Sequence, residues 1–176
     1  MKTLPLALML LALASVVKAQ HTGHGPARAQ PYTGLDGRAV PSLSTEELDG
    51  LRNGRGLAMA LPAELNGYPG PLHVLELADR LQLTPDQTRR TGALVTAMRK
   101  ETIDIGQAVI ATESQLDRSF KERRATPETI ETETKAVGAA RAALRAAHLR
   151  YHLVMAEMLN EQQIAEYRSA RGYRAP

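Results

Sequence analysis

The stretch LTPDQTRRTGALVTAMRKETIDIGQAVIATESQLDRSF, residues 83–120, predicts the longest helix of the chain and with it the fold. It begins with a strong helix start: Thr84 is the cap, Pro85 takes the first helical position, and Gln87 at the third can close a capping box. Apolar residues then recur on one face at spacings of four and seven. They are Leu94, Met98, Ile105, Val109, Leu116 and Phe120. A helix of about 40 residues would extend roughly 60 Å.

A second long helix is predicted after the break RRAT and Pro127, with Thr126 as its cap. Its stripe alternates spacings of four and three, a heptad-like seam interrupted by one arginine and one histidine. The stripe comprises Ile130, Thr134, Val137, Arg141, Leu144, His148, Tyr151, Met155 and Met158. The expected fold class is therefore all-α, a long antiparallel helical hairpin that turns near residue 125, with short flanking helices.

Two similar strings are expected to meet at the open end of this hairpin. LNEQQ, residues 159–163, repeats LTPDQ in kind: a leucine, a capping side chain, and a glutamine at the third helical position. Antiparallel packing places residues 84 and 159 at the same end. Asn160 is expected to close the second long helix and to begin a last short one that ends near Arg171.

The paired strings resemble the motif of the LTxxQ family of bacterial envelope proteins, which includes Spy- and CpxP-type stress proteins and zinc-resistance-associated proteins. CnrX-type nickel and cobalt sensors are more distant relatives in architecture. The resemblance spans roughly residues 72–171, and its second motif has asparagine as the cap. The motif residues are Leu83, Thr84, Gln87, Leu159, Asn160 and Gln163. The resemblance implies an all-helical, often dimeric, cradle-shaped periplasmic protein; some members hold unfolded clients, and others bind zinc or copper or sense metal.

The first residues of the chain have the layout of a secretory signal peptide. MKTLPLALMLLALASVVKAQ contains an early lysine, an apolar run and a small-residue ending, with cleavage expected after Ala19. We therefore expect an exported, periplasmic protein. Residues 20–43 are rich in glycine and proline without an apolar period, which predicts a flexible leader.

Short helices are predicted between the leader and the hairpin. Residues 44–70 are expected to hold two of them and a turn, the first capped by Ser44 and the second running from about Gly56 to Leu65. Residues 71–176 are expected to form the hairpin domain, which opens with a third short helix to about Gln82.

Charge and composition bear on two questions: whether the protein binds nucleic acid and whether it forms a dimer. Loss of residues 1–19 removes two lysines and no acid, so 22 basic residues become 20 against 19 acidic ones. This near-neutral balance argues against a nucleic-acid partner. The chain has no cysteine, one phenylalanine, five tyrosines and no tryptophan, so its core is thin. A thin core predicts a homodimer.

A metal-ligand set is one interpretation of the second long helix. His148 and His152 are four residues apart, so both imidazoles can reach one ion, and Met155 follows on the same face. The hairpin places Met98 opposite His152, with Glu101 a turn away. Imidazole and thioether together favour copper or another soft or borderline metal, so copper, zinc or nickel is the expected ion, although no cofactor is required.

A purely structural interpretation of the same residues stays open. His148 and Tyr151 can be half-buried seam residues, with Met155 as ordinary core filler. His73, at the positive end of the third short helix, can be a further ligand or a surface histidine.

Basic residues punctuate both long helices. Such residues ordinarily form a solvated face. In a Spy-like cradle they would attract flexible clients, which exposed apolar side chains would then hold. The candidates are Arg89, Arg90, Arg99, Lys100, Arg141 and Arg145.

The chain carries no sequence signal for an enzyme: it has no cysteine nucleophile and no GxSxG, HExxH or Walker-type motif. The function that the family resemblance implies, and that we predict first, is that of an ATP-independent, Spy/CpxP-like chaperone for unfolded or misfolded envelope proteins. Its further partners would be a second copy of itself and a membrane-bound sensor or signalling protein. Periplasmic binding of, resistance to or sensing of a heavy metal is the alternative.

Overall fold

The computed structural model describes residues 30–174, and every regular element in that range is helical. The chain divides into two units at residue 33. The described part of the first unit, residues 30–33, forms a turn in which the Thr33 amide donates to Gln30 O. The predicted signal peptide and residues 20–29 of the predicted leader lie outside the described residues. All of the helices described within residues 30–174 belong to the second unit.

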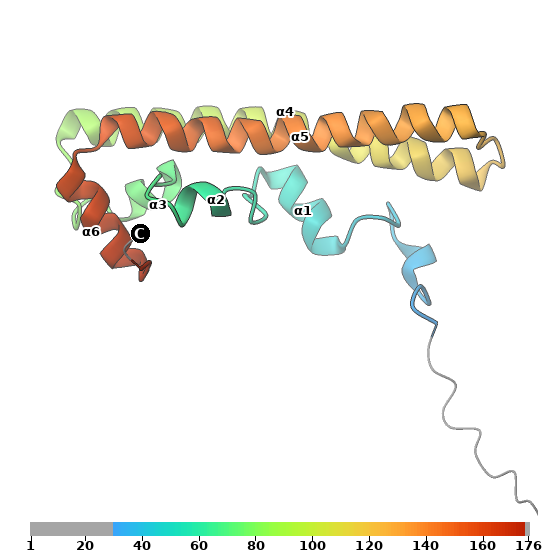
Figure 1. Ribbon diagram of the computed structural model, residues 1–176, viewed down its shortest axis with the longest axis horizontal. Coiled ribbons are helices and arrows are strands. Elements are labelled where there is room, and N and C mark those ends of the chain that lie inside the picture. Colours follow the sequence, from blue (N-terminus) through green and yellow to red (C-terminus); the bar gives the residue numbers. More distant parts are fainter. Residues whose placement is uncertain (1–29, 175–176) are drawn as a thin grey trace, which may run out of the picture. The chain divides into compact units, whose positions relative to one another are not determined.

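Two long helices, α4 (Pro85–Lys121) and α5 (Pro127–Met158), pack antiparallel and meet at a turn over residues 122–126 (Figure 1). At the start of α4 the Gln87 amide donates to Thr84 Oγ1 at 3.2 Å, and the Thr84 amide donates to Gln87 Oε1 at 3.0 Å. Thr126 and Thr129 form the corresponding box at the start of α5. The predicted hairpin, its turn and both helix starts are confirmed.

Four shorter helices complete the unit: α1 (Thr45–Asn53), α2 (Leu61–Glu64), α3 (Pro71–Glu76) and α6 (Glu161–Arg171). The first three lie along one side of the hairpin, and α6 folds back at the end where α4 begins (Figure 1). A 3₁₀ turn, Leu35–Gly37, precedes them. Ser44 and Asn160 cap α1 and α6 as predicted.

The second and third short helices are shorter than expected. Leu57 and Ala58 have φ of 43° and 59°, values that a right-handed helix excludes, so α2 begins only at Leu61. Gln82 has φ of 49°, and the chain reverses through turns after Glu76, which ends α3. The apolar residues predicted a helix there, but the tight return into α4 prevents it.

The core contains residues from the segment predicted as a flexible leader. Val40 and Leu43 are 5% and 2% exposed and pack with Leu51, Val109 and Leu144. The end of that segment is therefore part of the folded unit. Its two apolar residues gave no periodic signal because they lie in turns, outside any helix or strand.

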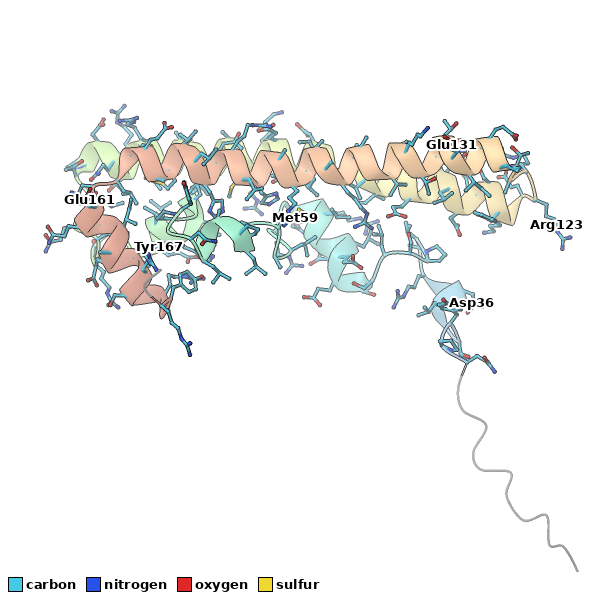
Figure 2. All side chains as sticks on the ribbon, in the orientation of Figure 1. Asp36, Met59, Arg123, Glu131, Glu161 and Tyr167 are labelled. Atoms are coloured by element: carbon cyan, nitrogen blue, oxygen red, sulfur yellow. The ribbon has the colours of Figure 1, made fainter. Side chains whose placement is uncertain are left out.

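A second cluster fastens α6 to the start of the hairpin. It joins Val74, Leu81, Met155, Leu159 and Tyr167, all at most 8% exposed. Tyr167 lies on α6, on the side facing α3 (Figure 2).

The apolar stripe predicted on α4 is only partly the buried face. Val109 is buried, Leu94, Met98, Ile105 and Leu116 are half-buried, and Phe120 is 56% exposed. The fully buried residues are mostly small or polar: Thr91, Thr102, Gly106, Glu113 and Ser119. They line α4 because the other helices approach it closely. A Cβ on Gly106, for example, would overlap the carbonyl of Leu51 on α1.

On α5 the prediction is closer, since Leu144, His148 and Met155 of the stripe are buried, together with Ala147 and His152. Among residues 30–174, no helix combines the length and the apolar character needed to cross a membrane.

Candidate functional site

A cavity of about 690 Å³ opens between the hairpin and the segment that carries α1, α2 and α3. α4 and α5 contribute one wall, and the chain from Asp49 to His73 contributes most of the other. Its polar or sulfur-bearing lining includes Glu64, His73, Met98, Arg99, His148 and His152. Side chains far apart in the sequence thus meet at one place.

The two histidines of α5 are held in the same tautomer. His148 Nδ1 lies 3.1 Å from Leu144 O, and His152 Nδ1 lies 2.9 Å from Tyr68 O. A carbonyl oxygen only accepts hydrogen bonds, so each Nδ1 carries the proton. In the neutral imidazole this leaves the lone pair on Nε2, the atom available to bind an ion or accept a hydrogen bond.

His148 Nε2 is buried and has no hydrogen-bond partner among the described residues. The residue is 3% exposed, and His152 is 4% exposed. Burial lowers the pKa of His148 below its ordinary value of 6.5; the hydrogen bond to Leu144 opposes this shift, and the charge of a protonated His152 would lower the pKa further. His148 is therefore neutral at pH 7. A neutral imidazole with an unused, dehydrated lone pair is a potential metal ligand.

Glu64 is a candidate residue that the sequence did not reveal. The residue is 9% exposed, and its carboxylate accepts from the Tyr167 hydroxyl, at 2.8 Å to Oε2 and 3.0 Å to Oε1. Within residues 30–174 no cationic side chain reaches it to form an ion pair. A buried carboxylate that receives one neutral donor is poorly compensated unless a cation binds it.

Glu64 and His152 approach each other across Gly70. A Cβ on Gly70 would lie 2.7 Å from Glu64 Oε1 and 3.4 Å from His152 Nε2. Burial raises the pKa of Tyr167 and the hydrogen bond to Glu64 raises it further, so the phenol stays a proton donor. No periodicity marks Glu64, because α2 is a single turn. The only sequence signal is the tight NGYPGP turn that follows, which brings the chain back to the hairpin.

The other predicted ligands divide into two groups. Met98 and His73 line the same cavity as His148 and His152, and His73 Nδ1 lies 2.9 Å from Glu76 Oε2. Met155 is fully buried in the α6 cluster, with its sulfur 3.8 Å from Thr91 Oγ1. It therefore serves as core, as the structural interpretation expected.

Glu101 is also placed away from the cavity. Its carboxylate accepts from Arg150 and, at 2.9 Å, from the Tyr151 hydroxyl. Within the described chain, no three histidine, aspartate or glutamate side chains are grouped closely enough to hold a metal ion as they stand. A metal at the cavity therefore requires side chains to move toward it.

Most of the basic residues predicted to bind clients are engaged within the chain. Arg89 and Arg90 pair with Asp86, and Lys100 pairs with Asp104. Arg141 pairs with buried Glu113, which also accepts from the Ser42 hydroxyl at 2.7 Å. Arg99 lines the cavity and Arg145 is exposed; among the described residues neither forms an ion pair.

Exposed apolar side chains lie beside the cavity. Leu61, Leu65, Tyr68 and Leu72, here called the apolar rim, come from α2, α3 and the turn between them. Leu61 and Leu72 also line the cavity. The rim gives the cavity an apolar edge.

The two glutamine-bearing motifs meet as predicted, and they bind each other. Gln87 Nε2 donates to Met158 O at 2.9 Å and to Gln163 Oε1 at 3.0 Å. Gln163 Nε2 donates to Gln87 Oε1 at 3.1 Å and to Leu81 O at 3.3 Å. These hydrogen bonds hold together the start of α4, the end of α5, the start of α6 and the turn before α4. The motif residues therefore have a structural role and do not line the cavity.

Comparisons of the chain with models of protein families, with curated proteins and with solved structures found no match. The LTxxQ-like motifs remain a resemblance, and a function must be argued from the geometry of the cavity.

Proposed function

We propose that the protein binds a transition-metal ion, copper, zinc or nickel, at the cavity, as a metal-binding, resistance or sensor protein of the bacterial envelope. The observation that carries the proposal is the pair of buried imidazoles, His148 and His152, with each Nδ1–H anchored on a backbone carbonyl and each Nε2 left for the cavity. Anchoring of this kind orients histidine ligands and sets their tautomer at metal sites.

The rest of the lining supports the same chemistry. Met98 supplies a thioether beside the imidazoles, a combination that favours copper or a borderline ion over magnesium or calcium. A bound cation would also give the unpartnered His148 Nε2 a ligand bond. Without the ion, these buried polar groups lower the stability of the folded protein. With the ion bound, the same groups would serve as its ligands.

Metal-dependent thermal stability tests the proposal. Each of the three ions is added to the wild type and to a His148→Ala/His152→Ala variant. A ligand at about a hundred times its Kd stabilises the native state by about 2.7 kcal/mol, so at least one ion should raise the Tm of the wild type but not that of the variant. Arg145→Ala, exposed on the same helix, is the matched control and should respond as the wild type does. Equal shifts in the double variant would remove the site.

A second function, ATP-independent holding of unfolded envelope proteins in a Spy/CpxP-like manner, is favoured by the apolar rim. Four large apolar side chains exposed within twelve consecutive residues, next to a cavity lined by Arg99, offer apolar contact and positive charge together. The resemblance to the LTxxQ family further implies that such a chaperone is a cradle-shaped homodimer with a membrane-bound signalling partner.

Suppression of aggregation tests the second function. The purified protein, near equimolar ratio, should keep an unfolded model substrate soluble, and a Leu61→Ser/Leu65→Ser/Leu72→Ser variant should lose that ability. Leu153→Ser, which alters an exposed leucine of α5, is the control. No suppression by the wild type at several-fold excess would exclude the function, and sedimentation of the same samples gives the subunit number.

A further inference from the structure

The part of the cavity wall that carries Glu64 is a short helix with two exposed leucines beside it. α2 is one helical turn that packs on α5 through a small contact and presents Leu61 and Leu65 to solvent. The preceding link contains Leu57 and Ala58 in the left-handed region, which is strained for residues with side chains. Leu57 and Met59 of the link pack against the first core cluster, but within α2 itself only Ala63 is a buried apolar residue.

Glu64 is nevertheless turned inward and buried. Its partner is the hydroxyl of Tyr167, and both carboxylate oxygens lie within hydrogen-bond distance of that one atom. A hydroxyl has a single proton to donate, so one oxygen at a time is left without a hydrogen. The carboxylate thus keeps a lone pair that the Tyr167 hydroxyl does not fill, at the lining of the cavity.

Glu64 Oε1 lies near the imidazole of His152. A Cβ on Gly70 would lie 2.7 Å from Glu64 Oε1, 3.0 Å from His152 Cε1 and 3.4 Å from His152 Nε2, so the carboxylate and the imidazole both approach the same glycine. Zinc binds carboxylate oxygen and imidazole nitrogen at about 2.0 to 2.2 Å. A modest inward shift of α2 would bring the two atoms to an ion between them.

We propose that Glu64 is the ligand that completes the metal site, and that ion binding therefore clamps α2 to α5. The inference rests on the proposed metal-binding function. One carboxylate oxygen would bind the ion together with the Nε2 atoms of His148 and His152. The other oxygen would continue to accept the hydrogen bond from the Tyr167 hydroxyl. Three protein ligands leave a fourth position open, as in zinc sites that exchange a small ligand. Binding would order the segment that carries half of the apolar rim.

Zinc binding to the full chain tests this inference, with Zn²⁺ alone as the probe. Glu64→Gln keeps an acceptor for Tyr167 and removes the charge. It should fold as the wild type does without metal, judged by circular dichroism and Tm, and bind zinc about tenfold or more weakly. Glu157→Gln, exposed on α5, is the matched control and should bind as the wild type does.

A second variant keeps the ligands and blocks their approach. Gly70 has φ of −82°, which alanine accepts, yet the added methyl would lie 2.7 Å from Glu64 Oε1 and 3.0 Å from His152 Cε1 and would push both side chains away. Gly70→Ala should therefore also weaken zinc binding. In the wild type, zinc should slow hydrogen exchange at the amides of Leu61 and of residues 63–66, and in Glu64→Gln it should not.

The outcomes separate the two proposals. Wild-type affinity and wild-type protection in Glu64→Gln would overturn the role of Glu64 and leave the histidine site standing. Zinc binding that is lost in His148→Ala/His152→Ala but unchanged in Gly70→Ala would also count against Glu64. No zinc binding by the wild type would overturn both proposals.

Discussion

The two halves of the hairpin are built in different ways. The covered part, residues 85–113 and 140–158, buries apolar, small and histidine side chains against the short helices; Val109, Leu144 and Met155 are among them. In the tip, residues 114–139, only Ser119 is buried. Figure 2 shows Arg123 at the turn of the tip and Glu131 projecting from α5 away from the short helices.

The tip is joined by polar contacts in place of an apolar core. Ser119 Oγ and Gln115 Nε2 donate to Glu133 Oε1 at 2.7 Å and 3.1 Å, while Phe120 and Ile130 are exposed. Burial of apolar area is the main source of stability, so the tip depends on helix propensity and caps. The covered part alone has the dehydrated environment that a binding site needs.

The largest expected difference between the halves concerns apolar side chains. Leu144→Ala removes a fully buried leucine from the covered part and should lower the free energy of unfolding by about 2 to 5 kcal/mol. Phe120→Ala in the tip should change it by less than about 0.5 kcal/mol. Denaturant unfolding measures both. A similar loss in the two variants would show that the tip is buried, as in a dimer interface.

Replacing a glycine by alanine tests how closely other helices pack against the covered part and against the tip. Gly106→Ala places a methyl against the backbone of Leu51 and should destabilise by about 1 to 3 kcal/mol. Gly138→Ala in the tip meets nothing within 4 Å and should stabilise by about 1 kcal/mol through helix propensity. Opposite signs in thermal unfolding confirm that α1 covers only one half; a loss at both sites contradicts it.

The caps at the two ends of the hairpin should differ by a smaller amount. Gln163→Ala removes a buried side chain bonded to Gln87, Leu81 and Asn160, and should cost about 1 to 2 kcal/mol. Thr129→Ala, at the exposed cap of α5, should cost less than about 1 kcal/mol. Urea titration of both variants is the measurement. A larger cost at Thr129 would place the stability in the tip.

The smallest effect is a difference in the response to acid. Burial lowers the pKa of His148, so the unfolded chain binds a proton at this residue more readily than the folded chain does. In metal-free protein, the contribution of neutral His148 to the free energy of unfolding is therefore complete above about pH 6.5. It is lost as the pH falls toward the lowered pKa. Hydrogen bonds from Ser119 and Gln115 lower the pKa of Glu133, whose contribution in the tip is lost only below its ordinary value of 4.5.

The pH dependence of Tm, measured with a chelator present, tests this order. Between pH 7 and pH 5 a His148→Asn variant should show a flatter profile than the wild type, while Glu133→Gln should differ from the wild type only below that range. An unchanged slope in His148→Asn would mean that His148 is not dehydrated.

Much of the fold could be predicted from short stretches of sequence. Thr84, Thr126 and Asn160 mark helix starts because each bonds a backbone amide three residues on, and the break near residue 125 forces the hairpin. The apolar stripe of α4 was less reliable, since it predicted burial of Phe120 and missed Thr102 and Gly106. A stripe predicts which face is apolar, but not where a third helix crosses it.

The candidate site was half predicted, for a related reason. His148 and His152 were recognised because four residues along one helix is a local relation. Met98 was predicted to lie near the site because antiparallel pairing of the two long helices places it opposite His152. Met155 and Glu101, at equally plausible spacings, turned out to bond with Thr91 and with Arg150 and Tyr151. Glu64 lies on a single turn with no period, so no local pattern marks it.

By itself, therefore, the sequence determined where the two long helices and α6 start and stop, the antiparallel pairing, and the meeting of the two glutamine motifs. These follow from hydrogen bonds and chain lengths within a few residues. The tertiary structure alone decided that the segment after α1 folds against one half of the hairpin and turns Glu64 toward His152 and Tyr167. Contacts between residues this far apart depend on where the short helices cross the long ones, which is set by close packing at residues such as Gly106 and Gly70.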